Sequence, residues 1–206
     1  MAAAPPVPTH QRAPLILASA SPRRLALLRQ IGIEPQAVSP PHIDETPHRR
    51  ELPVPYARRM AARKAAAVAP AHPGAFILAA DTVVAVGRRL LPKAENAATA
   101  RRCLELLSGR RHRVYGGLAV IAPDGRQIER LVTTIVWVKR LQPSEIDAYI
   151  EAGEWQGKAG GYAIQGLAAA FIPRINGSYS NVVGLPLTET AAVLAGLGYV
   201  PAGSKE

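Results

Sequence analysis

Two serines and two arginines follow a short apolar segment near the start of the chain. Ser19-Ala20-Ser21-Pro22-Arg23-Arg24 comes directly after Leu15–Ala18, which has the length of a buried strand. The unpaired N–H groups of a helix start favour an anion, hydroxyls add donors, and guanidinium groups match phosphate oxygens. Ser19, Arg23 and Arg24 therefore predict a phosphate site, although an ordinary helix cap with its arginines in solvent fits this segment equally well.

A carboxylate and a hydroxyl, Asp81-Thr82, end the apolar run Phe76–Ala80. Burying a carboxylate is expensive unless it is paired or binds a metal. In open α/β sheets, ligands collect beyond the carboxyl ends of strands. Asp81 is therefore predicted to be a general base or a metal ligand. The alternative is a turn residue that accepts backbone hydrogen bonds.

Charged side chains elsewhere could serve the same ligand. Asp44-Glu45 lies in a loop, and Mg²⁺ or Mn²⁺ would need only one or two such carboxylates. A solvated acidic pair explains these two residues equally simply. Lys64 and Lys93 are two of five lysines among 25 basic residues, so we interpret them as point charges directed toward phosphate.

Glycine is dense in two later segments, 157–166 and 176–181. Glycines let a backbone approach a ligand closely or turn with positive φ. Gln165, within the first segment, offers a donor and an acceptor, which suits a nucleobase edge or a water. Two ordinary turns remain the alternative.

The elements that must carry these residues alternate between strand and helix. Pro123-Asp124-Gly125-Arg126 predicts a hairpin turn between two strands. This order predicts an α/β fold with a mixed sheet and flanking helices. The expected strands are Leu15–Ala18, Phe76–Val86 (turning at Gly87 into Leu90–Leu91), Arg113–Ala122, Gln127–Val138 and Ala168–Arg174; the expected helices are Ser21–Ile31, Pro55–Val68, Asn96–Leu107, Ser144–Ala152 and Leu187–Leu197.

Length and composition predict one globular domain. The chain has 206 residues, 48% of them hydrophobic, and no apolar run approaches the roughly 20 residues of a membrane span. Residues 14–200 are expected to form this domain, between a flexible extension at 1–13 and a flexible tail at 201–206. The Ala- and Pro-rich extension does not resemble a signal peptide, so we expect a cytoplasmic protein without a membrane partner.

Several chemistries are disfavoured by what is missing. Cys103 is the single cysteine, which excludes an internal disulfide. Its place in a helical pattern beside Leu104, Leu106 and Leu107 indicates a core residue. There is no P-loop, no G-x-G-x-x-G, no H-E-x-x-H and no G-x-S-x-G. The histidines lack ligand spacing and are expected on the surface or in loops: His10, His42, His48, His72 and His112.

The net charge of +10 is carried largely by 20 arginines, a usage that compositional drift alone could produce. The physical alternatives are nucleic-acid binding or a phosphate-rich small substrate. Aromatic residues form only 5% of the chain and are not interleaved with the basic clusters, which disfavours a stacking platform for single strands. We therefore do not expect nucleic acid as a partner.

Six segments in order resemble Maf-family proteins, over about residues 15–197. Each segment alone is a weak signal, but the order and spacing of all six are specific. They are Ser19-x-Ser21-Pro22-Arg23-Arg24, Asp44-Glu45, Ala80-Asp81-Thr82, Ser108-Gly109-x-x-His112, Gly157-Lys158-Ala159-Gly160-x-Tyr162-x-Ile164-Gln165-Gly166 and Gly177-Ser178-x-x-Asn181-Val182-Val183-Gly184-Leu185-Pro186.

The resemblance implies a metal-dependent nucleoside triphosphate pyrophosphatase that uses Mg²⁺ or Mn²⁺. It also implies an elongated α/β fold similar to inosine triphosphatases, and often a homodimer. Carried over by position, Asp81 matches the proposed general base, and Glu45 and Asp81 are the expected metal ligands. The other matches are phosphate-binding positions at Ser19, Arg23, Arg24, Lys64 and Lys93, and positions that tune base preference at Arg23, Thr82 and Gln165.

The family resemblance extends to one of two bacterial branches. One branch resembles enzymes acting on dTTP and UTP, including modified uridine triphosphates, and the other resembles enzymes acting on 7-methyl-GTP. Segments 157–166 and 177–186 resemble the first branch, which implies a house-cleaning hydrolysis of dTTP and UTP to monophosphate and pyrophosphate. A 7-methyl-GTP pyrophosphatase remains an alternative, as does a binding protein that regulates septum formation or division with little catalysis.

Two positions depart from the family pattern. Ala94 follows Lys93 where the family usually has proline, and Gly116 stands where threonine is common. Neither change removes a charged group. We expect altered loop stiffness rather than lost activity.

Overall fold

The computed structural model describes residues 13–201, in which seven strands form one mixed sheet. The strand order is β2-β1-β3-β5-β6-β7, with β4 paired to β3. β1, β2 and β3 are parallel neighbours, and all other pairs are antiparallel. The strands are β1 Leu15–Leu17, β2 Ala37–Val38, β3 Phe76–Val86, β4 Arg89–Leu91, β5 Arg111–Ile121, β6 Gln127–Trp137 and β7 Arg174–Asn176.

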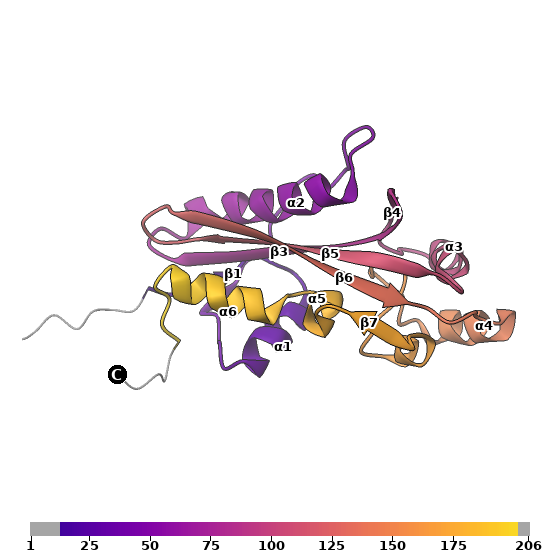
Figure 1. The fold of residues 1–206 in the computed structure, drawn as a ribbon. Coiled ribbons are helices and arrows are strands. Elements are labelled where there is room, and N and C mark those ends of the chain that lie inside the picture. Colours follow the sequence, from indigo (N-terminus) through magenta and orange to yellow (C-terminus); the bar gives the residue numbers. More distant parts are fainter. Residues whose placement is uncertain (1–12, 202–206) are drawn as a thin grey trace, which may run out of the picture.

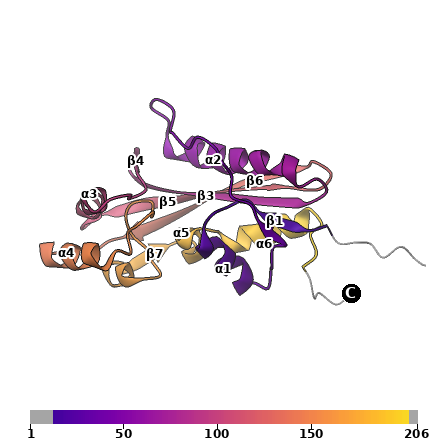
Figure 2. The same cartoon turned by 180° about the vertical axis from the view of Figure 1, so that it is seen from behind.

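Helices flank both faces of this sheet, which confirms the expected α/β class. In Figure 1, α2 lies along one face, and α1, α5 and α6 lie on the other. Figure 2 shows the same arrangement from behind, with α3 and α4 gathered at one end of an elongated molecule. The helices are α1 Pro22–Gln30, α2 Pro53–Val68, α3 Ala97–Leu107, α4 Pro143–Ala152, α5 Tyr179–Val183 and α6 Leu187–Gly196, with 3-10 turns at Ala69–Ala71 and Leu167–Phe171.

Small residues let α2 lie close to the sheet. Ala57, Ala61 and Ala65 are buried on the helix face that packs against β3 and β5. A Cβ added at Gly117 of β5 would come within 2.1 Å of the Ala57 carbonyl oxygen, so only glycine permits this approach. The close packing brings the next charged residue on that face, Lys64, down to the sheet.

The central strand β3 has one open edge in its middle. β1 pairs with Phe76–Leu78, and β4 pairs with Val84–Val86. Asp81 and Thr82 lie in the gap between these partners. Because successive side chains of a strand point to opposite faces of the sheet, the side chains of these two residues leave β3 on different faces. Asp81 follows the apolar run Phe76–Ala80, and β5 pairs through this position (Asp81↔Gly117), so Asp81 lies inside the expected strand Phe76–Val86 and not beyond its end.

Most predicted elements are confirmed to within two residues, but the strand expected at Ala168–Arg174 is wrong. Residues Leu167–Phe171 form a 3-10 turn, and the strand β7 begins only at Arg174. Ala168 and Phe171, three residues apart, are both buried in the core cluster that also contains α3 and α4. A spacing of three residues suits a 3-10 turn, whereas a strand would place these side chains on opposite faces.

The remaining expectations concern the core and the chain ends. Cys103 is buried, as expected. The flexible extension at 1–13 and the tail at 201–206 lie outside the described residues, apart from Ala13 and Pro201, and so does His10. None of the helices between residues 13 and 201 is long and apolar enough to cross a membrane.

Candidate active site

A cavity of about 330 Å³ lies at the open edge of β3, between the start of α1 and the two glycine-rich segments. Every residue given a site role by the family resemblance lines it, whereas Asp44, the neighbour of Glu45, does not. The lining residues come from the α1 start, the loop before α2, α2 itself, β3, the loop after β4 and the segment before the second 3-10 turn. These residues are Ser19, Arg23, Arg24, Glu45, Lys64, Asp81, Thr82, Lys93 and Gln165.

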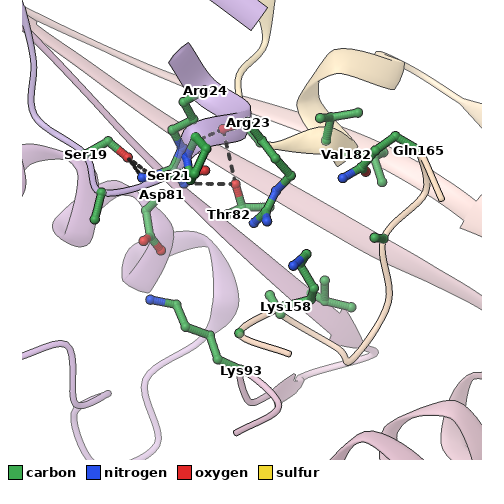
Figure 3. Close-up of a pocket in the computed structure, with 18 of the residues that line it drawn as sticks. Ser19, Ser21, Arg23, Arg24, Asp81, Thr82, Lys93, Lys158, Gln165 and Val182 are labelled. Carbon is green, nitrogen blue, oxygen red and sulfur yellow. Dashed lines mark hydrogen bonds between the residues drawn. The ribbon is translucent and has the colours of Figure 1, made fainter. Parts of the chain in front are cut away.

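Arg24 connects three segments at the base of this cavity. Its guanidinium donates to Ser19 Oγ at 2.9 Å, to Thr82 Oγ1 at 3.3 Å and to the Gly184 carbonyl at 2.9 Å (Figure 3). Burial lowers the pKa of Arg24, and the Asp81 carboxylate acts in the opposite direction. Arg24 therefore holds the α1 start against β3 and α5.

The first turn of α1 lines the cavity, although Pro22 has no N–H and the Arg24 N–H donates to the Ser21 carbonyl at 3.2 Å. Ser21 has extended N-cap geometry, but its side chain makes no capping hydrogen bond. Its own backbone N–H donates instead to Ser19 Oγ at 3.1 Å. A helix start without a side-chain cap is suited to an anionic ligand.

Two cations face each other above this helix start. Arg23 and Lys158 both line the cavity, and neither forms an ion pair with a carboxylate within residues 13–201. Burial lowers the pKa of both groups, and the charge of Arg23 lowers that of Lys158 further. Figure 3 shows both side chains directed into the same space. An anion between them would relieve this unfavourable juxtaposition.

Opposite them, carboxylates and ammonium groups alternate. Lys64 Nζ lies 2.5 Å from Asp81 Oδ1 and 2.9 Å from Glu45 Oε1, while Lys93 Nζ lies 2.5 Å from Glu45 Oε2. Asp81 and Lys64 are each only 4% exposed. Burial raises the pKa of Glu45, but hydrogen bonds from Lys93 and Lys64 outweigh it and bring the pKa to about 2. Glu45 therefore stays ionised at neutral pH.

The donor set fits a divalent ion such as Mg²⁺ or Mn²⁺ that is shared with substrate. Such ions take oxygen ligands and bind through one or two carboxylates together with phosphates. Glu45 and Asp81 contact the same ammonium group, that of Lys64, so both carboxylates reach one region of the cavity. Within residues 13–201, no group of three or more His, Cys, Asp and Glu is placed to hold a metal without such help.

The loop that carries Lys93 is fixed by the first glycine-rich segment. Ala94 donates its N–H to the Lys158 carbonyl at 3.0 Å and accepts from Gly157 at 2.8 Å. A proline at position 94 could not donate the first bond. These two backbone bonds join the loop that carries Lys93 to the segment that carries Lys158, and both lysines line the cavity.

A buried histidine supports the wall formed by Tyr162. The expectation of a surface position for His112 is wrong: it is 2% exposed within β5, with Nε2 2.7 Å from Tyr162 Oη. Burial lowers the pKa of His112 to about 4, so the ring is neutral at neutral pH. The scattered spacing of the histidines gave no sign of this role because Tyr162 is far away in the sequence.

Gly116 admits α5 to the sheet. A Cβ at this position would lie 1.8 Å from Asn181 Oδ1. The Asn181 amide donates to the Val114 carbonyl at 3.3 Å and to Thr134 Oγ1 at 3.1 Å. This contact places Val182, which lines the cavity, over the sheet.

Lys158 is a lining residue to which the sequence assigned no role. It lies in the first glycine-rich segment, 157–166, for which the sequence predicted only backbone freedom and a role for the Gln165 amide. Like Lys64 and Lys93, Lys158 is one of five lysines among 25 basic residues. That signal could have identified Lys158.

Comparison with known proteins shows the family of the chain. The family model described as Maf-like protein matches residues 14–197. A protein of Paramagnetospirillum magneticum named dTTP/UTP pyrophosphatase is 68% identical over 187 residues, covering 91% of this chain and 98% of that relative. A protein of the same name from Rhodospirillum rubrum is 62% identical, over 94% of this chain and 92% of the relative.

Among solved structures, a dITP/XTP pyrophosphatase from Mycobacterium abscessus has a TM-score of 0.43 at 20% identity, covering 89% of this chain and 93% of that one. The family model and the two close relatives decide the assignment. The chain belongs to the Maf family of Maf-like proteins.

Proposed function

We propose that the chain is a nucleoside triphosphate pyrophosphatase that hydrolyses dTTP and UTP to the monophosphate and pyrophosphate. The observation that carries this proposal is the division of one cavity into two halves. One half holds the alternating ionic series Asp81–Lys64–Glu45–Lys93, and the other holds cations without carboxylate partners beside a helix start. Relatives at 68% and 62% identity bear the name of this activity.

The triphosphate would occupy the cationic half. Arg23 and Lys158 flank the space in which its oxygens would lie, and the start of α1 lines the same space. Arg24 already binds three protein oxygens, so its main effect is to fix the shape of this half. Charge-assisted contacts of this kind hold and orient a polyphosphate.

Glu45 and Asp81 would hold the divalent ion together with phosphate oxygens. When bound, this ion neutralises charge that develops on the phosphates. Lys64 holds both carboxylates in place through contacts of 2.9 and 2.5 Å. Lys93 fixes the outer oxygen of Glu45 and adds positive charge at the mouth of the cavity.

Asp81 would accept the proton of the attacking water. The water oxygen forms a bond to the α-phosphorus, the bond from that phosphorus to the bridging oxygen breaks, and pyrophosphate leaves. The Asp81 carboxylate takes up the proton, which makes it the general base. Asp81 is only 4% exposed, and its contact with Lys64 holds the carboxylate in one orientation.

The base would lie toward Thr82 and Gln165. Uracil and thymine present carbonyl acceptors and an N3–H donor on one edge. The Gln165 amide can donate to the first and accept from the second. Arg23 also lines the cavity, and it would contact the nucleotide between its base and its phosphates.

We further propose that the enzyme works in the cytoplasm as a homodimer, as the family resemblance implies. The dimer is tested by light scattering coupled to size-exclusion chromatography at micromolar concentration. A mass near the 21.9 kDa of one chain would contradict it.

The proposed function is tested by pyrophosphate release from dTTP, UTP, CTP, ATP, GTP and 7-methyl-GTP, each with and without Mg²⁺ or Mn²⁺. Metal-dependent turnover led by dTTP and UTP is the expected result. Preference for 7-methyl-GTP would retain the reaction and overturn the substrate. Absence of turnover on every nucleotide would overturn the enzyme and favour a regulatory binding protein.

A further inference from the structure

The loop between β2 and α2, residues 39–52, carries Glu45 and has no apolar anchor. None of its residues is buried, and it contains no helix or strand. A loop of this kind is normally mobile because few contacts oppose its conformational entropy. We refer to it as the Glu45 loop.

Three side chains of α2 bind three consecutive carbonyls of the Glu45 loop. Tyr56 Oη donates to the Glu45 carbonyl at 2.7 Å, Arg59 Nη2 to that of Thr46 at 3.2 Å, and Arg63 Nη1 to that of Asp44 at 3.3 Å. Positions 56, 59 and 63 recur on one face of a helix. The backbone on both sides of Glu45 is thus held by a single rigid element.

Arg59 also closes the C-terminal part of the loop. Its guanidinium lies 2.7 Å from Glu51 Oε1 and 2.5 Å from Glu51 Oε2. Glu51 accepts a further hydrogen bond from the backbone of His48 at 2.9 Å. These bonds, with Arg59 foremost, lower the pKa of Glu51 to about 2, so the carboxylate remains charged over the range in which the enzyme would work.

The same helix also fixes the Glu45 side chain. Lys64 follows Arg63 directly and contacts Glu45 Oε1 at 2.9 Å. The backbone and the carboxylate of Glu45 are therefore both held by α2. This helix packs closely on β3, the strand that carries Asp81. Fixing the residue in advance removes the entropy that binding would otherwise have to overcome.

We propose that Tyr56, Arg59 and Arg63 are positioning residues that hold the Glu45 loop so that the Glu45 carboxylate is ready for the divalent ion. This inference rests on the proposed function, in which Glu45 holds that ion with Asp81. It adds a role for a face of α2 that does not line the cavity.

The decisive variant is Tyr56→Phe, which removes one hydroxyl and keeps the ring. Loss of one hydrogen bond corresponds to a change of about 3- to 10-fold. We expect the Mg²⁺ concentration for half-maximal turnover to rise by this factor, with a smaller change in KM for dTTP. Tyr199→Phe is the matched control, because Tyr199 packs against Phe76 at the other end of the sheet.

A double-variant cycle shows whether Tyr56 acts through Glu45. In a Glu45→Gln background, Tyr56→Phe should cause no further loss, because the carboxylate that it positions is already gone. Equal losses in both backgrounds would overturn the proposal and indicate a merely structural hydroxyl. Thermal unfolding of each variant separates this from general destabilisation: a lower melting temperature without a shift in the Mg²⁺ requirement also contradicts positioning.

A binding measurement keeps the inference separate from the reaction. Mn²⁺ is titrated by electron paramagnetic resonance into the full chain with pyrophosphate present. Weaker Mn²⁺ binding by Tyr56→Phe and Arg63→Met supports positioning, and unchanged binding overturns it. If the wild-type protein binds Mn²⁺ yet hydrolyses no nucleotide, the proposed function fails while this comparison still decides the positioning role.

Discussion

At the scale of single residues, Asp81 is the proposed general base and Lys64 is the cation that holds it. We expect Asp81→Asn to lower pyrophosphate release from dTTP by at least about 100-fold, because an amide cannot take up the proton of the attacking water. Lys64 keeps Glu45 as a partner at 2.9 Å, so its ammonium group is not left alone in the interior. Stopped-time pyrophosphate assays measure the loss of turnover, and a thermal melt shows whether the variant keeps its stability.

Asp124→Asn is the control for this experiment. Asp124 is an exposed hairpin residue paired with Arg126, and it should tolerate the same change without loss of turnover. Near-normal turnover of Asp81→Asn with Mg²⁺ present would contradict the proposed mechanism.

Lys158 is expected to bind substrate phosphate. Lys158→Met should raise KM for dTTP by about 10-fold or more, as loss of a charge-assisted hydrogen bond implies. Binding of uridine, which has no phosphate, should not change. Lys139→Met serves as the comparison because Lys139 pairs with Glu145 outside the cavity. If both variants keep the wild-type KM, Lys158 does not contact the phosphates.

The residue types of the site were predictable, but the contacts among them were not. Asp81 and Glu45 were predicted as carboxylates and the two lysines as rare residues in an arginine-rich chain, and the structure brings all four into one ionic series. Which carboxylate pairs with which lysine depends on the approach of α2 to β3, and no local pattern encodes that approach. The role of Arg24 as a connector to Gly184 is equally long-range.

At the scale of elements, His112 couples β5 to the first glycine-rich segment and should make stability depend on pH. Its pKa is lowered from 6.5 to about 4, so between these values the unfolded chain binds a proton that the folded protein does not. Stability is therefore fully present above pH 6.5 and falls as the pH drops toward 4, by up to about 3 kcal/mol. Urea unfolding across this range should show the decline.

His112→Gln should remove the pH dependence in this window while the amide still reaches Tyr162. Its stability at neutral pH is expected to fall moderately, because the ring leaves a partly empty site in the core. A variant whose stability declines as steeply as that of the wild-type protein between pH 6.5 and 4 would assign the effect to another group.

Gly116 should not accept threonine. Gly116→Thr would force a Cβ toward Asn181 Oδ1, 1.8 Å away, and displace α5 at a cost of about 1–3 kcal/mol or more. Gly196→Ala is the control, since a Cβ there meets nothing within 4 Å and alanine favours a helix. Denaturant unfolding compares them; a neutral Gly116→Thr would mean that Asn181 adapts to the larger residue.

The elements with strong local signals were predicted well. Phe76–Val86 has the predicted bounds because a long apolar run with β-branched residues specifies a buried strand. The two-residue strand β2 and the five-residue helix α5 were not foreseen, since segments this short owe their conformation to their neighbours. The second 3-10 turn was mistaken for a strand for the same reason.

At the scale of the molecule, the cavity exists because the sheet changes character at β3. The parallel strands β1 and β2 lie on one side, and the antiparallel strands β5, β6 and β7 lie on the other. β1 ends at Leu17, which pairs with Leu78, and β4 ends at Leu91, which pairs with Val84, so the middle of β3 is left open to the elements that carry the charges. A mixed sheet was predictable from element order, but the length of this gap is set by tertiary pairing.

The net charge of +10 should attract a nucleoside triphosphate from a distance. We expect kcat/KM for dTTP to fall as NaCl rises from about 20 to about 300 mM, because screening shortens the reach of the charges, while kcat changes little.

Two variants separate surface charge from local contact. Arg130→Glu, on the exposed face of β6, should reduce kcat/KM only slightly and flatten its salt dependence a little. Lys158→Met should lose affinity for dTTP at every salt concentration. A kcat/KM that is insensitive to salt would show that local contacts alone recruit the nucleotide and that the arginine-rich surface serves no steering role. Salt-sensitive retention of DNA that persists with dTTP and Mg²⁺ present would instead assign the surface charge to nucleic acid.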